Sequence, residues 1–276
     1  MHLGIKNKFG IYFVLHSVFT IFATMISKNR VKFIRSLEQR KYRREHGLFV
    51  VEGPKSVADM FGSFECVYVA ATQEWLSQNE LPDGVEVDEV TDDELRRASF
   101  QDHPQQVLAL FRIPSYAYSS RCFEVELCLA LDNVQNPGNL GTIIRLADWF
   151  GIERVFCSSG TADVYNPKVV QATMGSLARV KVHYVDLPAL LASLPAGVPV
   201  YGTFLDGENL YGEELGSRGL IVMGNEGNGI SKEVEQYVTH RLTIPNYNQH
   251  DRGADSLNVA VATAVVCAEF RRRFGN

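Results

Sequence analysis

The chain has 276 residues, of which 46% are hydrophobic, so a globular protein with one large or two modest packed cores is expected. Its formal net charge of −5 argues by itself against a nucleic-acid-binding protein, although net charge can conceal a local basic segment. The five cysteines form no C-x-x-C pair and the histidines show no metal-ligand spacing, which indicates free thiols in a reducing compartment and no metal site.

Residues 1–25 stand apart from the rest of the chain. Two lysines precede a mostly apolar run at 11–23, an order that imitates a secretory signal peptide. The run is short for a membrane span, is interrupted by His16 and Ser17, and precedes no clear A-x-A cleavage pattern. We therefore interpret this stretch as an upstream extension or non-native leader, with natural translation starting at Met25. A cytoplasmic protein with no stable membrane partner is expected.

A basic segment follows the leader. From Lys28 to Arg44 it has eight cations and one acidic residue, Glu38, which gives +7. Apolar residues at 31, 34 and 37 lie on one stripe of a helix predicted over about 27–42. A solvated charged face and a surface that contacts phosphates are both compatible with this pattern. The cations are Lys28, Arg30, Lys32, Arg35, Arg40, Lys41, Arg43 and Arg44.

Residues 26–113 are predicted to form a small α/β domain. Buried strands are expected at 48–53, 67–70 and 107–111, with helices near 54–61 and 91–98. The acidic stretch 80–94 resembles a solvated edge. Residues 114–122 have no clear apolar period and are the predicted linker.

Residues 123–276 are predicted to form a second, larger α/β domain. Six apolar runs of strand length alternate with helix-compatible segments, and the chain closes with a helix that opens near Ser256. This alternation is typical of a mostly parallel sheet with flanking helices. The predicted strands are 126–131, 155–157, 180–184, 198–204, 220–223 and 242–244.

Three polar patches follow strands of this sheet, at 136–145, 224–229 and 244–258. Ligands of open α/β sheets bind where strands end, so the patches could line one pocket. Considered alone, the first is explained by a helix with Asn139 as its N-cap and Arg145 on its polar face, and the second by a glycine turn. The glycine spacing fits neither the dinucleotide fingerprint nor the phosphate loop G-x-x-x-x-G-K-[ST].

The three patches, in this order, resemble the three motifs of the SpoU/TrmH family of RNA ribose methyltransferases. The first motif matches Asn139, Arg145, Ala147 and Phe150-Gly151. The second matches Gly224, Glu226 and Gly229, and the third matches Ile244-Pro245 and residues 256–259. The resemblance covers most of residues 26–270 and includes the segment 172–176.

The resemblance implies a deep C-terminal trefoil knot, which is an exception to the rule that chains avoid knots. It implies S-adenosylmethionine as the methyl donor, S-adenosylhomocysteine as the product, a structured RNA as substrate with ribosomal RNA favoured over tRNA, and a homodimer. The small N-terminal domain would bind the RNA, in agreement with its basic segment. The implied cofactor-binding residues are Thr203, Gly224, Asn225, Gly229, Ile244, Pro245 and Leu257.

Methyl transfer to a ribose 2′-hydroxyl requires removal of a proton from a poor nucleophile. The resemblance implies that Arg145 accepts this proton. An arginine side chain is normally always charged, however, so two roles stay open. Arg145 is either the base, or a fork that clamps the adjacent phosphate and lowers the pKa of the hydroxyl. The resemblance further implies that Asn139, Ser256 and Asn258 orient the reacting groups and that Glu226 braces its loop.

Two departures from the family pattern stand out. The link 246–255 is longer than usual, and Ala260 occupies a position where serine is common.

Two other classes of protein remain as alternatives. One is a non-catalytic RNA-binding protein of the same fold, against which the joint presence of the five predicted catalytic residues argues. The other is a dinucleotide-dependent oxidoreductase, which the missing fingerprint disfavours.

Overall fold

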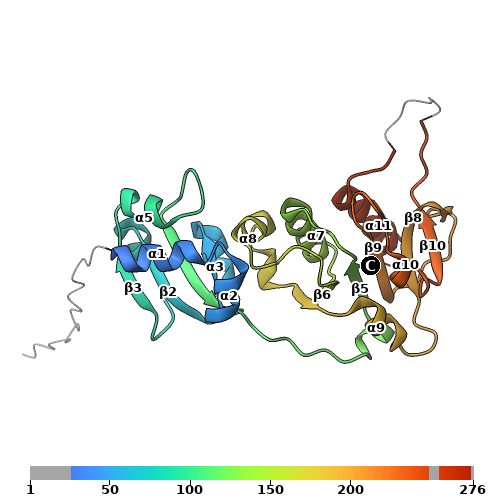
Figure 1. Cartoon of the computed structure of the whole chain (residues 1–276), viewed down its shortest axis with the longest axis horizontal. Coiled ribbons are helices and arrows are strands. Elements are labelled where there is room, and N and C mark those ends of the chain that lie inside the picture. Colours follow the sequence, from blue (N-terminus) through green and yellow to red (C-terminus); the bar gives the residue numbers. More distant parts are fainter. Residues whose placement is uncertain (1–25, 249–254, 275–276) are drawn as a thin grey trace, which may run out of the picture.

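The structure, a computed structural model, describes residues 26–248 and 255–274, so the predicted leader 1–25 lies outside it. Two α/β units lie end to end along the longest axis of the molecule, each built on its own sheet (Figure 1). A search of the described helices for one with the length and hydropathy of a membrane-spanning segment finds none.

The N-terminal unit has a four-stranded sheet with the order β1-β4-β2-β3. Strand β4 is antiparallel to both of its neighbours, and the acidic stretch supplies the edge strand β3, which pairs in parallel with β2. Its elements are α1 (Lys28–Ser36), α2 (Arg40–His46), β1 (Leu48–Glu52), α3 (Pro54–Met60), β2 (Cys66–Ala71), α4 (Gln73–Gln78), β3 (Glu86–Glu89), α5 (Asp92–Ala98) and β4 (Val107–Arg112).

The single basic helix predicted over 27–42 is in fact two helices. Helix α1 begins after Ser27, whose hydroxyl accepts a hydrogen bond from the Arg30 N–H, and its C-cap is Leu37. Gln39, the N-cap of α2, is extended, so the second helix leaves in a new direction. Ile34 and Leu37, two residues of the predicted apolar stripe, are both fully buried in a cluster with residues of β1, β2 and β4.

The C-terminal unit has a six-stranded sheet with the order β10-β8-β9-β5-β6-β7, in which every pairing is parallel. This confirms the predicted mostly parallel sheet, and each of the six predicted strands is present. The strands are β5 (Leu127–Leu131), β6 (Arg154–Cys157), β7 (Lys181–Tyr184), β8 (Val200–Asn209), β9 (Gly219–Met223) and β10 (His240–Thr243).

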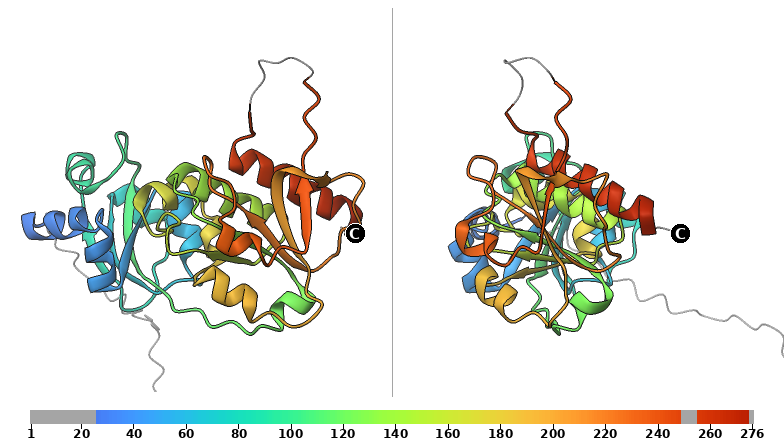
Figure 2. Two further views of the ribbon diagram at one scale, coloured as in Figure 1. Left: turned by 45° about the vertical axis from the view of Figure 1, so that its right-hand side comes forward. Right: turned by 90° about the vertical axis from the view of Figure 1, so that its right-hand side faces the viewer.

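Helices cover both faces of this sheet (Figure 2). Central strand β5 is buried throughout, and alternate residues belong to different apolar clusters: Leu129 lies with the residues of α7 and α11, and Cys128 with those of α9 and α10. Such two-sided burial explains why the strand is a continuous apolar run. The helices are α6 (Cys122–Val125), α7 (Pro137–Trp149), α8 (Pro167–Thr173), the short 3₁₀ helix η1 (Ser176–Ala178), α9 (Leu187–Ala192), α10 (Lys232–Glu235) and α11 (Val259–Phe274).

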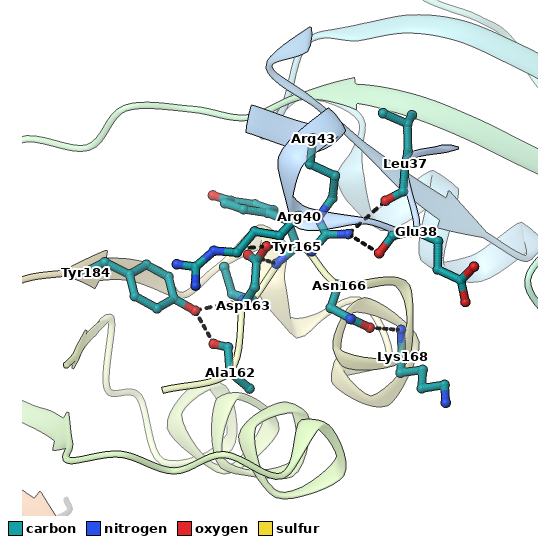
Figure 3. Close-up of polar contacts among 11 residues, drawn as sticks. Leu37, Glu38, Arg40, Arg43, Ala162, Asp163, Tyr165, Asn166, Lys168 and Tyr184 are labelled. Atoms are coloured by element: carbon teal, nitrogen blue, oxygen red, sulfur yellow. Dashed lines mark hydrogen bonds and ion pairs between the residues drawn. The ribbon is translucent and has the colours of Figure 1, made fainter. Parts of the chain in front are cut away.

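The two units are joined by a buried contact as well as by the linker. Helix α8 packs against β1, and the rings of Phe49 and Tyr165 lie 4.8 Å apart between their centroids. Beside them the Arg43 guanidinium pairs with Asp163 at 2.6 Å (Figure 3). Arg43 is 1% exposed and its partner comes from the other unit, so this pair is a buried contact between the two units.

The segment 114–121 has no helix or strand, in keeping with a linker, but it lies against the second sheet. The rings of Tyr116 and Tyr118 lie 6.1 and 5.1 Å from the His183 ring of β7. All five cysteines are free thiols.

Candidate active site at the carboxyl edge of the parallel sheet

The three motif loops begin at the same edge of the second sheet, because they follow β5, β9 and β10, which all run in one direction. Parallel strands present their free backbone groups and helix N-termini at that edge. Side chains from the three loops are in contact there, as the hydrogen bonds below describe.

The first loop turns into α7 at Asn136. The Asn136 Oδ1 accepts hydrogen bonds from the N–H groups of Gly138, at 2.8 Å, and Asn139, at 3.1 Å, and Pro137 occupies the first helical turn. The prediction that Asn139 is the N-cap is therefore wrong. Proline favours the first helical position because its missing N–H would be unpaired there, and this places the cap on Asn136. The Asn139 side chain is free for another purpose.

The Asn139 side chain joins all three motifs. Its Nδ2 donates to Glu226 Oε1 at 2.8 Å, and its Oδ1 accepts from Asn258 Nδ2 at 3.0 Å. An ionised carboxylate can only accept, which fixes the amide with its nitrogen towards Glu226 and its oxygen towards Asn258. Residues separated by 87 and 119 positions in sequence are thus connected through one amide group.

The Glu226 loop is closed upon itself. The backbones of Asn225 and Gly229 exchange hydrogen bonds of 2.9 and 3.0 Å. Asn225 Oδ1 also accepts from the Gly227 and Asn228 N–H groups, and its Nδ2 donates to the Asn133 carbonyl at 2.7 Å. A Cβ on Gly224 would lie 2.2 Å from the Gly229 carbonyl carbon, so only glycine fits at that position.

The third motif begins α11. Asn258 Oδ1 accepts from the N–H groups of Ala260, at 2.9 Å, and Val261, at 3.3 Å, which is the pattern of an N-cap. Its Nδ2 is consequently turned towards Asn139. Ser256 and Leu257, just before the cap, are exposed.

Arg145 lies on α7, about 9 Å further along the helix axis than Asn139 at 1.5 Å per residue. Its side chain is exposed, and within the described part of the chain no hydrogen bond or ion pair engages it. The other arginines nearby are engaged: Arg179 binds Asp148 through two nitrogens, and Arg271 donates to the Phe150 carbonyl. Arg145 is thus a cation available to an external group.

The remaining predicted cofactor residues lie around this edge. Thr203 Oγ1 donates to the Val222 carbonyl at 3.2 Å, next to Gly224, and Ile244 packs on the main core with Pro245 beside it, half-buried. Among the described residues, the backbone N–H groups of Ile244 and Leu257 find no acceptor.

Comparison with known proteins identifies the family. The SpoU rRNA Methylase family matches residues 126–268, more than half of the chain. The chain belongs to this family. The MRM3-like substrate binding domain matches residues 28–109, so both halves of the SpoU-family chain have recognisable relatives.

Individual relatives match this SpoU-family protein over nearly its whole length. The 23S rRNA (guanosine(2553)-2′-O)-methyltransferase RlmP of Bacillus subtilis is 32% identical over 245 residues, which cover 88% of this chain and 96% of the relative. A TrmH-family structure from Porphyromonas gingivalis is 44% identical with a TM-score of 0.83, covering 91% and 100% of the two chains. The AdoMet-bound rRNA methyltransferase from Sinorhizobium meliloti is 31% identical with a TM-score of 0.79, covering 92% and 98%.

The basic segment of the SpoU-family chain divides into engaged and free cations. Arg43 is the clear exception to the predicted RNA surface: its guanidinium is buried, donates to the Leu37 and Glu38 carbonyls and pairs with Asp163. The prediction that Arg43 contacts RNA is wrong, because a residue 1% exposed cannot reach a phosphate.

Three further arginines of the segment are partly engaged inside the protein. Arg30 pairs with Glu86, Arg35 donates to the Ser99 carbonyl, and Arg40 lies 3.8 Å from Asp163. Four cations are exposed and have neither a side-chain hydrogen bond nor an ion pair among the described residues: Lys28, Lys32, Lys41 and Arg44.

Two residues that shape the site were not singled out from the sequence. Asp132, 2% exposed, accepts a hydrogen bond from the Ser231 N–H at 2.8 Å and so fixes the end of the Glu226 loop. Asn133 has φ +57° and presents its carbonyl to Asn225. The available signal was an Asp-Asn pair directly after a buried strand, since Asn is the non-glycine residue that tolerates positive φ best.

Proposed function

We propose that this protein transfers the methyl group of S-adenosylmethionine to a ribose 2′-hydroxyl of RNA, with ribosomal RNA favoured over tRNA. The observation that carries the proposal is the Glu226–Asn139–Asn258 chain of hydrogen bonds, which gathers the three motifs beside an unengaged Arg145. Relatives named as rRNA 2′-O-methyltransferases support it, as does a related structure named as AdoMet-bound.

In this proposal the cofactor supplies the methyl group, and S-adenosylhomocysteine is the product. The loops at Gly224, Asn225, Gly229, Ile244, Pro245 and Leu257, with Thr203, hold it. Asn225 acts through the shape of the loop, because its side-chain atoms are already engaged with Gly227, Asn228 and Asn133. The backbone N–H groups of Ile244 and Leu257, for which the described part of the chain offers no acceptor, would bind polar edges of the ligand.

The chemical roles follow from the contacts. Glu226 fixes the amide of Asn139, and Asn258 holds the other end of the same amide, so the first turn of α7 has a fixed orientation. Arg145 on that helix either takes the proton of the 2′-hydroxyl or clamps the adjacent phosphate and lowers the pKa of the hydroxyl. Ser256, exposed before the cap of α11, would orient the nucleophile.

We assign RNA binding to residues 26–113, followed by the linker 114–122 and the methyltransferase domain 123–276. The free cations Lys28, Lys32, Lys41 and Arg44 would contact phosphates, with partial contributions from Arg30, Arg35 and Arg40. The match to a substrate binding domain over residues 28–109 supports this division. The five free cysteines support a cytoplasmic location.

A homodimer is part of the proposal. Helices α7 and α11 pack together, and each leaves a large apolar side chain exposed: Trp149 at 84% and Val261 at 51%. Exposed apolar groups on adjacent helices suit a protein interface. Light scattering is expected to give twice the monomer mass, and Trp149→Glu is expected to shift it towards the monomer.

A trefoil knot at the C-terminal end is also proposed. Strand β10 is at one edge of the sheet, whereas α11, the next helix, packs on α7 beyond β8 and β9. A return from the edge strand β10 to α7 is compatible with such a knot, which further requires that the chain thread through a loop.

The test of the proposed function is a map of ribose methylation in cells with and without the protein. Loss of one or a few 2′-O-methyl groups from ribosomal RNA is expected in its absence. Loss from tRNA instead would change the substrate but keep the reaction. Unchanged methylation in both RNA classes would refute the proposal.

A further inference from the structure

Strand β8 leaves the sheet at the edge where the motif loops meet. It pairs with β9 as far as Gly202, opposite Val222, and with β10 as far as Gly202, opposite Arg241. The ladder with β10 resumes only at Glu208, opposite Leu242. Residues 203–207, in the middle of β8, therefore have no ladder partner and form a bulge that lies beside β10, where a Cβ on Gly207 would meet the Leu242 backbone at 2.6 Å.

Arg241 holds this bulge by two kinds of contact. Its guanidinium carbon lies 3.6 Å from the centre of the Phe204 ring, and its Nη2 donates to Asp206 Oδ1 at 2.8 Å. Its Nη1 donates to Glu235 of α10, so the guanidinium is itself held in place. A planar guanidinium can stack on a ring and bind two carboxylates at once, which an ammonium group cannot do.

Phe204 lies between Arg241 and the sheet. A Cβ on Gly202 would lie 2.7 Å from the Phe204 ring, and the ring packs on the cluster that includes Val238. The absence of a Cβ at Gly202 thus leaves the space that the ring occupies. With Arg241 above it and Gly202 below it, the ring anchors the middle of the bulge.

The neighbours of Phe204 face away from Arg241, because alternate residues of an extended chain point in opposite directions. Thr203 Oγ1 donates to the Val222 carbonyl at 3.2 Å, and Leu205 is 78% exposed, with its carbonyl accepting from Thr243 Oγ1 at 3.3 Å. The bulge, held by Arg241, thus places the Thr203 hydroxyl and the Leu205 side chain at the edge of the candidate site.

We propose that Arg241 is a positioning residue for S-adenosylmethionine, acting through Phe204 and Asp206 to hold Thr203 and Leu205 against the cofactor. The inference rests on the proposed function. An exposed ion pair contributes little to stability, so loss of Arg241 is expected to affect the bulge far more than the fold. Its effect should therefore be selective for the cofactor.

The test is calorimetric titration of the full chain with S-adenosylhomocysteine. Arg241→Met is expected to raise the Kd about tenfold or more, through loss of a pre-organised loop, with Arg241→Lys in between. The KM for S-adenosylmethionine rises in parallel, while kcat at saturating cofactor and the KM for RNA stay near the wild-type values. The matched control is Arg218→Met. Arg218 lies just before the amino end of β9, away from the motif loops, and donates to the Glu124 carbonyl. It should leave the Kd unchanged.

A second variant checks the route of the effect. Phe204→Leu is expected to weaken binding as well, and the double variant with Arg241→Met to bind no worse than the weaker single variant, because both changes release the same bulge. Wild-type affinity in Arg241→Met would overturn the inference. So would a joint loss of cofactor affinity, RNA affinity and thermal stability, which marks a merely structural role. If the wild-type protein itself bound no S-adenosylhomocysteine, the proposed function would fail instead.

Discussion

Asn139 and Arg145 belong to the same motif and the same helix but have opposite environments. Asn139 is held at both ends of its amide, by Glu226 and by Asn258. Arg145 is exposed, and no described residue binds it. A fixed group next to a free one is the arrangement expected where the protein holds its own geometry and leaves one charge for the substrate.

Arg145→Lys is the prediction at this scale. We expect kcat to fall at least about a hundredfold, because an ammonium is a point charge and cannot reproduce the planar fork needed by either role of the arginine. Binding of S-adenosylhomocysteine should stay near the wild-type value, since the cofactor loops do not contact this side chain in the proposal. Near-normal methylation by the variant would contradict the assignment.

At the scale of single elements, α11 is tied down at its C-terminal end by charged groups. Glu269, 5% exposed, accepts from Arg272 and Arg273 at 2.7 Å each, and Arg273 also donates to the Tyr211 carbonyl at 2.9 Å. The Arg272 and Arg273 guanidiniums hold the pKa of Glu269 at about 2, below its usual 4.5. Cations at this end also suit the helix dipole.

This depressed pKa predicts an acid-sensitive helix end. The Glu269 carboxylate stays ionised in the folded protein at pH values where it is protonated in the unfolded chain, so folding and ionisation support each other. Its contribution to stability is complete above about pH 4.5 and is lost as the pH falls towards 2. Thermal unfolding across this range should show a shallower pH dependence for Glu269→Gln than for the wild type. Identical slopes would contradict the prediction.

The strands were predictable because each buried strand of the second sheet is a short apolar run that stands between helix-compatible segments. The edge strand β3 was not, since Glu86 and Asp88 give it an acidic sequence without an apolar face. The cap of α7 was assigned to the wrong asparagine, although Pro137 at the start of the helix favours Asn136. The motif residues were found from the family resemblance, and their mutual contacts needed the fold.

The burial of Arg43 could not be predicted from the local sequence. It is one of eight cations in a row of similar appearance, and what removes it from the surface is Asp163, a residue of the other sheet. No local pattern links the two positions. At the scale of the whole molecule this pair and the Phe49–Tyr165 contact join the N-terminal unit to the C-terminal unit.

Arg43→Met tests this arrangement. The substitution leaves Asp163, whose side chain is 15% exposed, without its buried partner, so we expect a loss of about 2–4 kcal/mol in the free energy of unfolding. Urea denaturation measures it. The control is Arg44→Met, an exposed neighbour, which should change stability by less than about 0.5 kcal/mol while weakening RNA binding. Equal stability of Arg43→Met and the wild type would show that the pair does not join the units.

The measurement that tests the central claim most directly is methyl transfer in vitro. Purified protein is incubated with S-adenosylmethionine labelled in its methyl group and with unmodified ribosomal RNA, and the RNA is then digested to nucleosides. The label is predicted to appear in a 2′-O-methylnucleoside with the wild type and to be absent with Asn139→Ala, which breaks the contact between the three motifs. Label in a base, or equal ribose labelling by Asn139→Ala, would contradict the account.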